Sequence, residues 1–300
     1  ICNWNFPMLE QQLLNALTLG SVYALFALGF TLVFGVLAVI NLSHGAVFMV
    51  GSYAALAMVS HLNAPLWVAM LGAMVVSGTI GLLVDVLVLK PLRARNAPHL
   101  IPMIATIGVG IMLTSAAQGL FGAEVLRFPE DVMPAGEFMV GDVHVRALEI
   151  AIVAIAFLLM AVLFTILKRT QLGRALRAIA ESPKAAYLLG INVEGLFHIT
   201  SFVAAALGGI AGVLIGLNFN AITPFMGQPM LHKGIAVIIL GGMGDIRGAL
   251  IGGLFLGFAE VISKAYLSSQ MGDAVAFGLL FLILLVRPSG LFGRKLERKA

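Results

Sequence analysis

The sequence predicts an all-α, polytopic membrane protein with about eight to nine transmembrane segments, one or two of them short or broken. Of its 300 residues, 60% are hydrophobic and only 11% are charged, whereas soluble domains average about 45–50% and about 25%. The mean hydropathy is +1.05. A soluble core of this chain length cannot bury so much apolar surface, so lipid must solvate part of it. The apolar runs are continuous rather than alternating, which excludes a β-barrel.

Nine apolar runs are candidates for membrane crossings, since a helix needs about 20 residues to span the bilayer core. Two of them, Gly45–Ser60 and Lys233–Gly244, are short, so we expect tilted, broken or re-entrant elements there. The others are Leu13–Leu37, Leu66–Leu89, Ile101–Phe121, Leu148–Leu167, Phe197–Leu217, Ala249–Ala265 and Ala274–Val286.

The placement of charge predicts the orientation in the membrane. With an external N-terminus and nine crossings, most of the 18 basic residues fall in internal loops, as the positive-inside rule requires. The longest external loop, 122–147, is acidic, and the segment 168–196 is basic and internal. No linker divides the chain, so residues 1–300 are expected to form a single transmembrane domain.

Several classes of function are excluded by missing motifs. There is no GxxxxGK[ST] phosphate loop, no HExxH and no GxSxG, and no two histidines are four residues apart. The single cysteine, Cys2, rules out a disulfide framework or a CxxC metal site. We therefore expect no catalytic residues, no bound metal or cofactor and no nucleic-acid partner. The sequence pI of about 9.4 reflects the basic internal loops of a membrane protein and not a nucleic-acid-binding surface.

The internal segment 168–196 carries the densest pattern. Leu172, Leu176 and Ile179 lie on one face of an amphipathic helix. Ser182 is expected to cap a second short helix that begins at Pro183, with Gly190 ending it. The segment is either a lipid-surface helix with internal positive charge or a docking element for a cytoplasmic partner. Small residues at 185, 186 and 190 favour docking, because they let another backbone approach closely.

Polar residues interrupt the apolar runs at two places. Asn41, Ser43 and His44 separate the first two runs, and they form either an internal turn or a polar lining of a transport path. On the outer side, Asn218, Asn220 and Gln228 belong to a kinked polar stretch that is either an ordinary loop or the mouth of that path.

Glycine and charge patterns give three weaker indications. The run 241–248 is expected to break a helix, either at membrane depth or as a tight internal turn. Asp85 near Lys90, and Glu260 four residues before Lys264, indicate local charge neutralisation rather than proton relays. The segments beginning at Gly45 and Gly234 match each other, but too loosely to predict a repeat.

Three stretches make the chain similar to the permease subunits of branched-chain amino acid ABC transporters, the LivH type. They are GFTLVFGVLAVINLSHGAVFMVGSYAA (29–55), GRALRAIAESPKAAYLLGINV (173–193) and MGQPMLHKGIAVIILGGMGDIRGALIGG (226–253). The resemblance extends along almost the whole chain. Its 173–193 stretch resembles the EAA-type loop at Ala185, Ala186 and Gly190, but has Lys184 where that loop has a glutamate, and no proline follows at the loop's usual end.

The resemblance implies a subunit of an ABC importer in the inner membrane of a bacterium. Its expected partners are a second homologous permease, two cytoplasmic ATPases that bind the ATP, and a periplasmic or extracellular solute-binding protein. It implies import of branched-chain or related amino acids. The alternatives are a permease for urea, short amides or another small polar solute, and an ion-coupled secondary transporter.

Two sets of residues are expected to serve this transport, the first from the polar interruptions described above and the second from the 173–193 stretch. The expected translocation path includes Asn41, Ser43, His44, Asn218, Asn220 and Gln228. The residues expected to dock an ATPase are Gly173, Arg174, Arg177, Glu181, Lys184, Ala185, Ala186 and Gly190.

Overall fold

A computed structural model describes residues 6–98, 100–129, 132–133, 136–140, 143–287 and 290–292. Its long elements are α1 (Phe6–Leu37), α2 (His44–Leu62), α3 (Leu66–Val84), α5 (Leu100–Phe121), α6 (Ala147–Arg169), α9 (Val193–Phe219), α10 (Gly227–Gly241), α11 (Ile246–Tyr266) and α12 (Met271–Val286). The short ones are a π-helical turn η1 (Asp85–Leu89), α4 (Lys90–Ala94), α7 (Gln171–Glu181), α8 (Pro183–Leu188), β1 (Glu137–Val140) and β2 (Val143–Arg146).

The predicted fold class is confirmed. Within the described residues, seven helices are long and apolar enough to cross a membrane, and α12 is a shorter apolar helix. Helix α10, with 15 residues, falls below the length of a full crossing. The sequence therefore located every long helix, and it identified α2 and α10 as the irregular ones.

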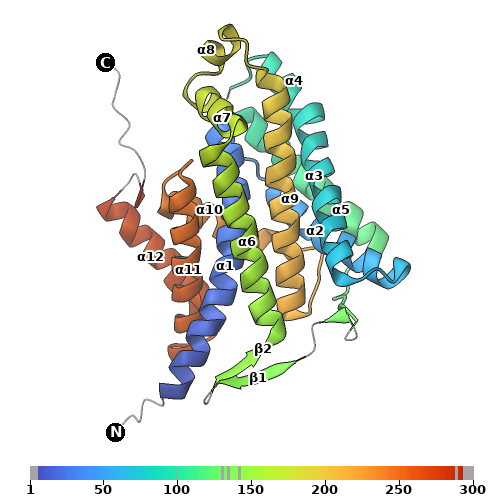
Figure 1. Cartoon of the computed structure of the whole chain (residues 1–300), viewed down its shortest axis with the longest axis vertical. Helices are drawn as coiled ribbons and strands as arrows, with labels where there is room; N and C mark the ends of the chain where they lie inside the picture. Colours follow the sequence, from blue (N-terminus) through green and yellow to red (C-terminus); the bar gives the residue numbers. More distant parts are fainter. Residues whose placement is uncertain are drawn as a thin grey trace.

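The two ends of the bundle carry different elements (Figure 1). We call the end that carries the antiparallel hairpin β1–β2 the hairpin end, and the end that carries α7 and α8 the basic end. Strand β2 leads directly into α6, and the backbone N–H of His144 donates to Oε1 of Gln11 on α1 at 3.0 Å. The N-terminal part of α1 therefore lies at the hairpin end.

Helices α2 and α10 both begin inside the bundle. His44, the first residue of α2, packs on Phe26 and Phe30 of α1, well below the end of α1 at Leu37. Gly227, the first residue of α10, lies against Gly45. From this common depth, α2 runs to the hairpin end and α10 to the basic end.

The two halves of the chain therefore repeat with inverted direction. Helix α1 rises to the basic end, an extended segment returns to mid-depth, and α2 and α3 follow; α9, α10 and α11 repeat this path upside down. Inverted repeats that meet at discontinuous helices are common in transporters. Gly45 and Gly227 each lie at the start of the helix that begins inside the bundle in its half.

Small residues allow the two closest helix pairs to pack. Helix α11 approaches α1 where Gly253 faces Ala24 and Gly257 faces Gly20. Helix α3 approaches α9 where Gly81 faces Ala205 in the same manner. A Cβ at any of these glycines would meet neighbouring atoms at less than a contact distance, so close backbone approach requires glycine there.

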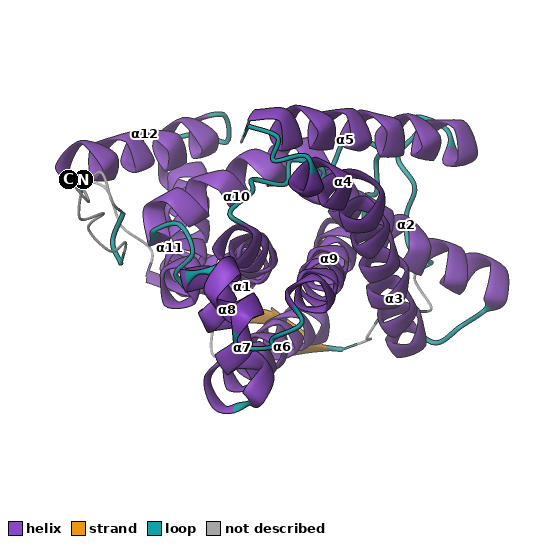
Figure 2. Ribbon diagram, turned by 90° about the horizontal axis from the view of Figure 1, so that it is seen from above, coloured by secondary structure: helices purple, strands orange, loops and turns teal. Residues whose placement is uncertain are grey.

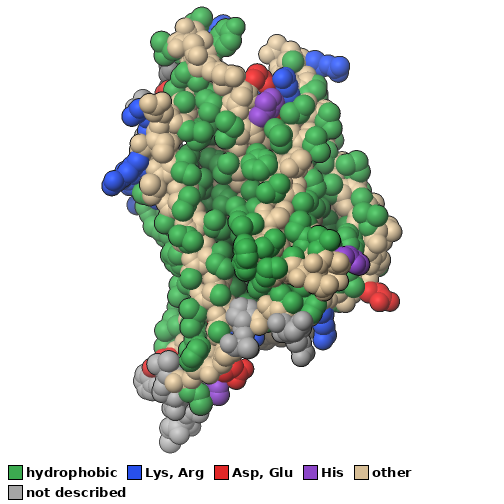
Figure 3. Space-filling view, turned by 45° about the vertical axis from the view of Figure 1, so that its right-hand side comes forward, with side chains coloured by type: hydrophobic (Ala, Val, Ile, Leu, Met, Phe, Trp, Pro, Cys, Tyr) green, Lys and Arg blue, Asp and Glu red, His purple; other side chains and the backbone are tan. Residues whose placement is uncertain are grey.

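The outside of the bundle is apolar across its middle and charged toward its ends (Figure 3). Helices α5 and α12 lie along one edge, on either side of α10, when the molecule is viewed from above (Figure 2). Helix α5 buries little of its surface, and its Leu100, Ile104 and Ile111 side chains are more than 60% exposed. That pattern fits a helix surrounded by lipid or by another membrane subunit.

Candidate functional site

The start of α2 and the start of α10 meet backbone to backbone at mid-depth. A Cβ on Gly45 would clash with the carbonyl oxygen of Gly227, and a Cβ on Gly227 would clash with that of Gly45. Two helix N-termini at one point bring several free N–H groups together. Broken helices at membrane depth occur where backbone is covered by protein or lines a cavity.

Asn41 and Ser43 order the backbone that enters α2. The Asn41 Oδ1 atom accepts hydrogen bonds from the Ser43 hydroxyl at 2.6 Å and from the Ser43 backbone N–H at 3.1 Å. Thr106 on α5 accepts from the backbone N–H of Leu42 at 3.1 Å. These polar side chains accept hydrogen bonds from backbone N–H groups that lie outside the helices. They are buried and do not face a channel.

His44 fills the space between α1 and α9. Its ring lies 4.7 Å from the ring of Phe26 and 5.4 Å from that of Phe30, and Gly29 and Gly208 leave room for it. The side chain is buried, and its Nε2 atom has no hydrogen-bond partner among the described residues. A buried ring nitrogen without a partner is costly, so this is a place where a small rearrangement would gain a hydrogen bond.

The six residues assigned to the path do not form one site in this structure. Asn220 ends α9 in the left-handed conformation, and its Oδ1 accepts from the backbone N–H of Phe128 at 2.9 Å. Asn218 lines a pocket at the hairpin end. Gln228 lies exposed on the first turn of α10, next to the contact between Gly45 and Gly227. Asn41, Ser43, His44 and Gln228 thus share one depth, while Asn218 and Asn220 lie nearer the hairpin end.

The glycine-rich run 241–248 forms a tight turn at the basic end. Gly242 and Gly244 have positive φ angles of 100° and 87°, and Asp245 caps α11 by accepting from the backbone N–H groups of Arg247 and Gly248. Of the two interpretations of this run, the turn is therefore the observed one. The break at mid-depth lies instead before the other end of α10.

Asp85 forms a buried charge cluster near the basic end. Arg93 donates from Nη1 to Asp85 Oδ1 at 2.7 Å, and His198 Nδ1 lies 2.6 Å from Asp85 Oδ2. The expected pairing with Lys90 is wrong, because Lys90 lies 3.9 Å from Glu194 instead. The π-helical turn that begins at Asp85 rotates the following residues, so that Arg93, two turns away, reaches the carboxylate.

A second charge cluster connects α1, α10, α11 and α12. The buried Glu260 accepts from Lys264 at 2.6 Å, as the four-residue spacing predicted, and also from Lys233 at 2.7 Å and from the Tyr23 hydroxyl at 2.9 Å. Asp273 on α12 lies 3.2 Å from Lys233. Lys233 belongs to the half-length helix α10, so this cluster attaches that helix to three neighbours.

Helices α7 and α8 form a short helical pair at the basic end. Thr170 caps α7 and Ser182 caps α8, the latter through a 3.3 Å bond from the Ala185 N–H, and Gly190 has φ of 80°, all as the sequence predicted for 182–190. Gly173 and Ile179 are buried, whereas Arg174 is exposed. Arg177 donates to the carbonyl oxygen of Leu167, which attaches α7 to the end of α6.

The residues expected to dock an ATPase face two ways. Ala186 is 2% exposed and packs inward, so it belongs to the interior of the pair. Glu181, Lys184, Ala185 and Gly190 are exposed. The most prominent outward feature is an apolar tip of Tyr187, Leu188 and Leu189, each more than 70% exposed, which the sequence analysis did not single out.

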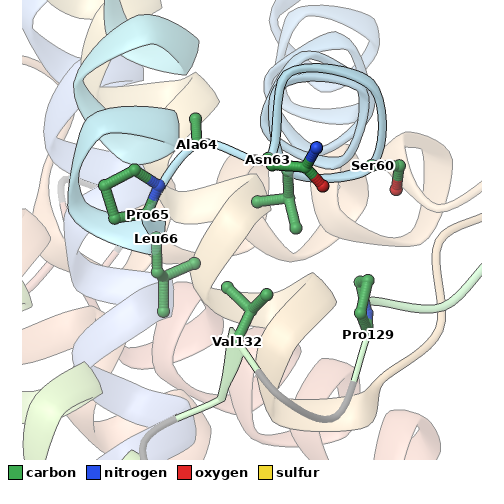
Figure 4. A pocket seen from close by; sticks show the side chains of 8 residues that line it. Ser60, Asn63, Ala64, Pro65, Leu66, Pro129 and Val132 are labelled. Carbon is green, nitrogen blue, oxygen red and sulfur yellow. The ribbon is translucent and has the colours of Figure 1, made fainter.

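Two pockets open at the hairpin end. One lies between the α2–α3 turn and the 122–147 loop, where Asn63, Pro65 and Leu66 face Pro129 and Val132 (Figure 4). It carries no charged side chain. The other, which we call the outer pocket, is lined by α1, α6, α9 and α11 and includes Arg146, Glu149 and Lys264.

The fold and these features define a class of protein: a multi-pass membrane transport subunit, with an inverted repeat and helices broken at mid-depth. Residues 12–284 match the sequence model of the family described as "Branched-chain amino acid transport system / permease component". The chain belongs to this family, and it is a multi-pass protein of the bacterial inner membrane and a transport subunit rather than an enzyme.

Several known permeases are similar to the chain along its length. It is 38% identical to the high-affinity branched-chain amino acid transport system permease protein LivH of Escherichia coli K12, over 95% of both chains. It is 39% identical to the corresponding protein BraD of Pseudomonas aeruginosa, over 95% of both. The ribose import permease protein RbsC of Escherichia coli K12 is 30% identical over 82% of this chain and 76% of its own. No solved structure matches.

Proposed function

We propose that this chain is the membrane-spanning subunit of an ATP-driven importer of branched-chain amino acids. The similarity to LivH and BraD over 95% of both chains is the observation that supports it most directly, because it covers every helix of the bundle. The sequence has no phosphate loop, so ATP must be hydrolysed by separate subunits. The proposed partners are two cytoplasmic ATPases, a second homologous permease and a solute-binding protein.

The pairing of the buried charges favours a path opened by partner subunits over one driven by an ion gradient. The buried acidic side chains of the described residues are all paired: Asp85 with Arg93, Glu149 with Arg146, and Glu260 with Lys233 and Lys264. A carrier driven by an ion gradient more often has an unpaired acid that binds the coupling ion inside the membrane. We therefore place the translocation path beside Asn41, Ser43, His44 and Gln228, at the depth where α2 and α10 begin.

The α7–α8 pair is the proposed contact with an ATPase. It is a compact helical projection at the basic end, built from residues 171–188 and stopped by Gly190. Its exposed surface combines Lys184 and Ala185 with the apolar tip. An exposed apolar tip flanked by a basic residue is typical of a surface that binds a groove on a partner protein.

A reconstitution experiment tests this proposal. The chain is placed in proteoliposomes with its two ATPases, its second permease and its binding protein, and uptake of labelled leucine is measured. We expect uptake that requires ATP on the ATPase side, is unchanged by an ionophore and is absent with the chain alone. Leucine uptake by the chain alone, driven by an ion gradient, would show a secondary transporter. Uptake of ribose but not leucine would assign the substrate class of the RbsC relatives.

A further inference from the structure

The outer pocket is a half-open depression at the hairpin end, between four helices that are far apart in the sequence. Its volume is about 440 Å³, and its walls come from α1, α6, α9 and α11. Ligand pockets of small molecules generally measure about 300–1,000 Å³. The pocket therefore has the size to take one small solute at the end of the bundle where the acidic external loop lies.

The exposed charged groups on the polar side of the outer pocket are two cations, each paired with a more buried carboxylate. The side chains of Arg146 and Lys264 are 48% and 42% exposed, whereas Glu149 and Glu260, which pair with them, are only 4% and 1% exposed. The cations thus reach the opening and the carboxylates stay behind them. Guanidinium and ammonium groups in this position attract a ligand carboxylate through charge-assisted hydrogen bonds.

Neutral hydrogen-bonding groups face the same space. The amides of Gln12, Asn15 and Asn218 line it, and the Asn218 side chain makes no hydrogen bond to the other described residues. Amide oxygens accept hydrogen bonds from a ligand ammonium group without adding charge. The pocket can therefore bind both charges of a zwitterion.

The remaining wall is apolar. Leu19 on α1 and Val261 and Ala265 on α11 line the pocket beside the charged groups. Leu19 and Val261 are themselves well packed, so this wall is fixed in shape. An aliphatic side chain placed against it is removed from water, which favours binding.

We propose that the outer pocket is an acceptor subsite for a zwitterionic amino acid with an aliphatic side chain, where the solute binds before it reaches the broken helices. Lys264 and Arg146 bind its carboxylate, Asn218 its ammonium group, and Leu19 and Val261 its side chain. This assignment rests on the proposed function and names a residue set for it. A neutral sugar has no carboxylate for the two cations, so the subsite discriminates against ribose.

The experiment uses the purified full chain in nanodiscs of phosphatidylcholine, with a diazirine analogue of leucine as the photoactivatable probe. Adducts are mapped by mass spectrometry. We expect labelling of the α1, α9 and α11 segments around residues 12–19, 218–219 and 261–265, reduced at least fivefold by excess leucine. Leucinamide, which lacks the carboxylate, and ribose should leave it unchanged.

Three variants separate binding from folding. Lys264→Gln should lower the specific labelling at least fivefold while the bundle stays folded, because Glu260 keeps its bonds from Lys233 and Tyr23. Lys264→Arg should restore it. The matched control is Arg169→Gln, which removes a cation from the opposite end of α6 and should label like the unmodified chain.

Two outcomes of the labelling would overturn the subsite: labelling that is spread over the apolar surface and that leucine does not reduce, or wild-type labelling in Lys264→Gln. A third is pocket labelling that phosphatidylglycerol displaces and leucine does not, which would indicate a site for a lipid headgroup. Together with the reconstitution, the labelling experiment distinguishes a failure of the subsite from a failure of the proposed function. If the complete transporter imports leucine with ATP and the pocket is not labelled, only the subsite is wrong. If the transporter imports ribose and not leucine, the proposed function is wrong, and the subsite with it.

Discussion

Gly45 and Gly227 lie in contact through their backbones, although 181 positions separate them in the sequence numbering. Each is the first or second residue of a helix that begins inside the bundle, and neither has room for a Cβ atom. The contact joins the two inverted halves at the depth of the proposed translocation path. Any motion that separates α2 from α10 must open this contact first.

A methyl group at this contact should therefore disturb both folding and transport. Gly227→Ala places a Cβ against the carbonyl oxygen of Gly45, and overpacking of this kind costs about 1–3 kcal/mol. We expect a lower melting temperature in detergent and reduced leucine uptake. Gly108→Ala is the matched control, since that α5 glycine has no atom within 4 Å of its Cβ position and alanine is favoured in helices. Equal behaviour of the two variants would contradict the close contact.

Removal of the Asp85 carboxylate should destabilise the basic end. In Asp85→Asn, Arg93 and His198 lose their buried anionic partner, and the loss of one member of a buried pair costs about 3–5 kcal/mol. Thermal unfolding of purified protein measures the effect. Glu194→Gln is the comparison, because its side chain is 48% exposed and such pairs contribute less than about 1 kcal/mol. A larger loss from Glu194→Gln than from Asp85→Asn would refute this interpretation of the cluster.

The orientation of the bundle can be measured with single cysteines. In a Cys2→Ser background, Lys184→Cys on α8 should react with an impermeant maleimide only after the cells are opened, because basic loops remain inside. Phe138→Cys on the exposed hairpin should react in intact cells. Both side chains are exposed, so differences in reactivity report the side of the membrane and not burial. Labelling of position 184 from outside would invert the topology.

Continuous apolar runs in the sequence predicted most of this fold. Helices α3, α5 and α6 follow from apolar runs alone, and the caps at Ser182 and Gly190 follow from local residue preferences. Sequence also indicated that the second run was irregular. The sequence did not reveal that α10 begins at Gly227, because the charged Lys233 suggested that the apolar run starts there. In the structure Glu260, on α11, neutralises this lysine, so the helix can include it.

The candidate site was harder to predict, because it depends on contacts across the sequence. Asn41 was chosen because it lies between two apolar runs, and Asn220 because it lies in a polar, kinked stretch. The side-chain oxygen of each accepts a hydrogen bond from a backbone N–H outside the helices. Arg146 and Glu149 gave no motif, and Lys264 was noted only as the neighbour of Glu260. The packing of α6 and α11 against α1 brings the three side chains to one pocket.

The last prediction concerns α8, where the docking and lipid-surface interpretations differ. The apolar tip of Tyr187, Leu188 and Leu189 points away from the bundle, and none of the three is part of the interior. If the tip binds an ATPase, Leu188→Asp places a charge in an apolar contact, and the ATPase should fail to co-purify. Gly190→Trp should act similarly, because φ of 80° disfavours any side chain and the indole would cover the tip.

Ala186→Glu would not separate the two interpretations, because Ala186 is buried and a carboxylate there should unfold the helical pair itself. Leu188→Asp separates them, and Arg174→Gln is its control, since it removes an exposed cation of α7, worth about 1 kcal/mol of attraction to anionic lipid, and leaves the apolar tip unchanged. Docking predicts a normal complex in Arg174→Gln and a lost complex in Leu188→Asp, with both proteins inserted at equal levels. A lipid-surface helix predicts a normal complex in both. Wild-type ATPase co-purification and uptake in Leu188→Asp and Gly190→Trp would therefore remove residues 171–190 from the coupling contact.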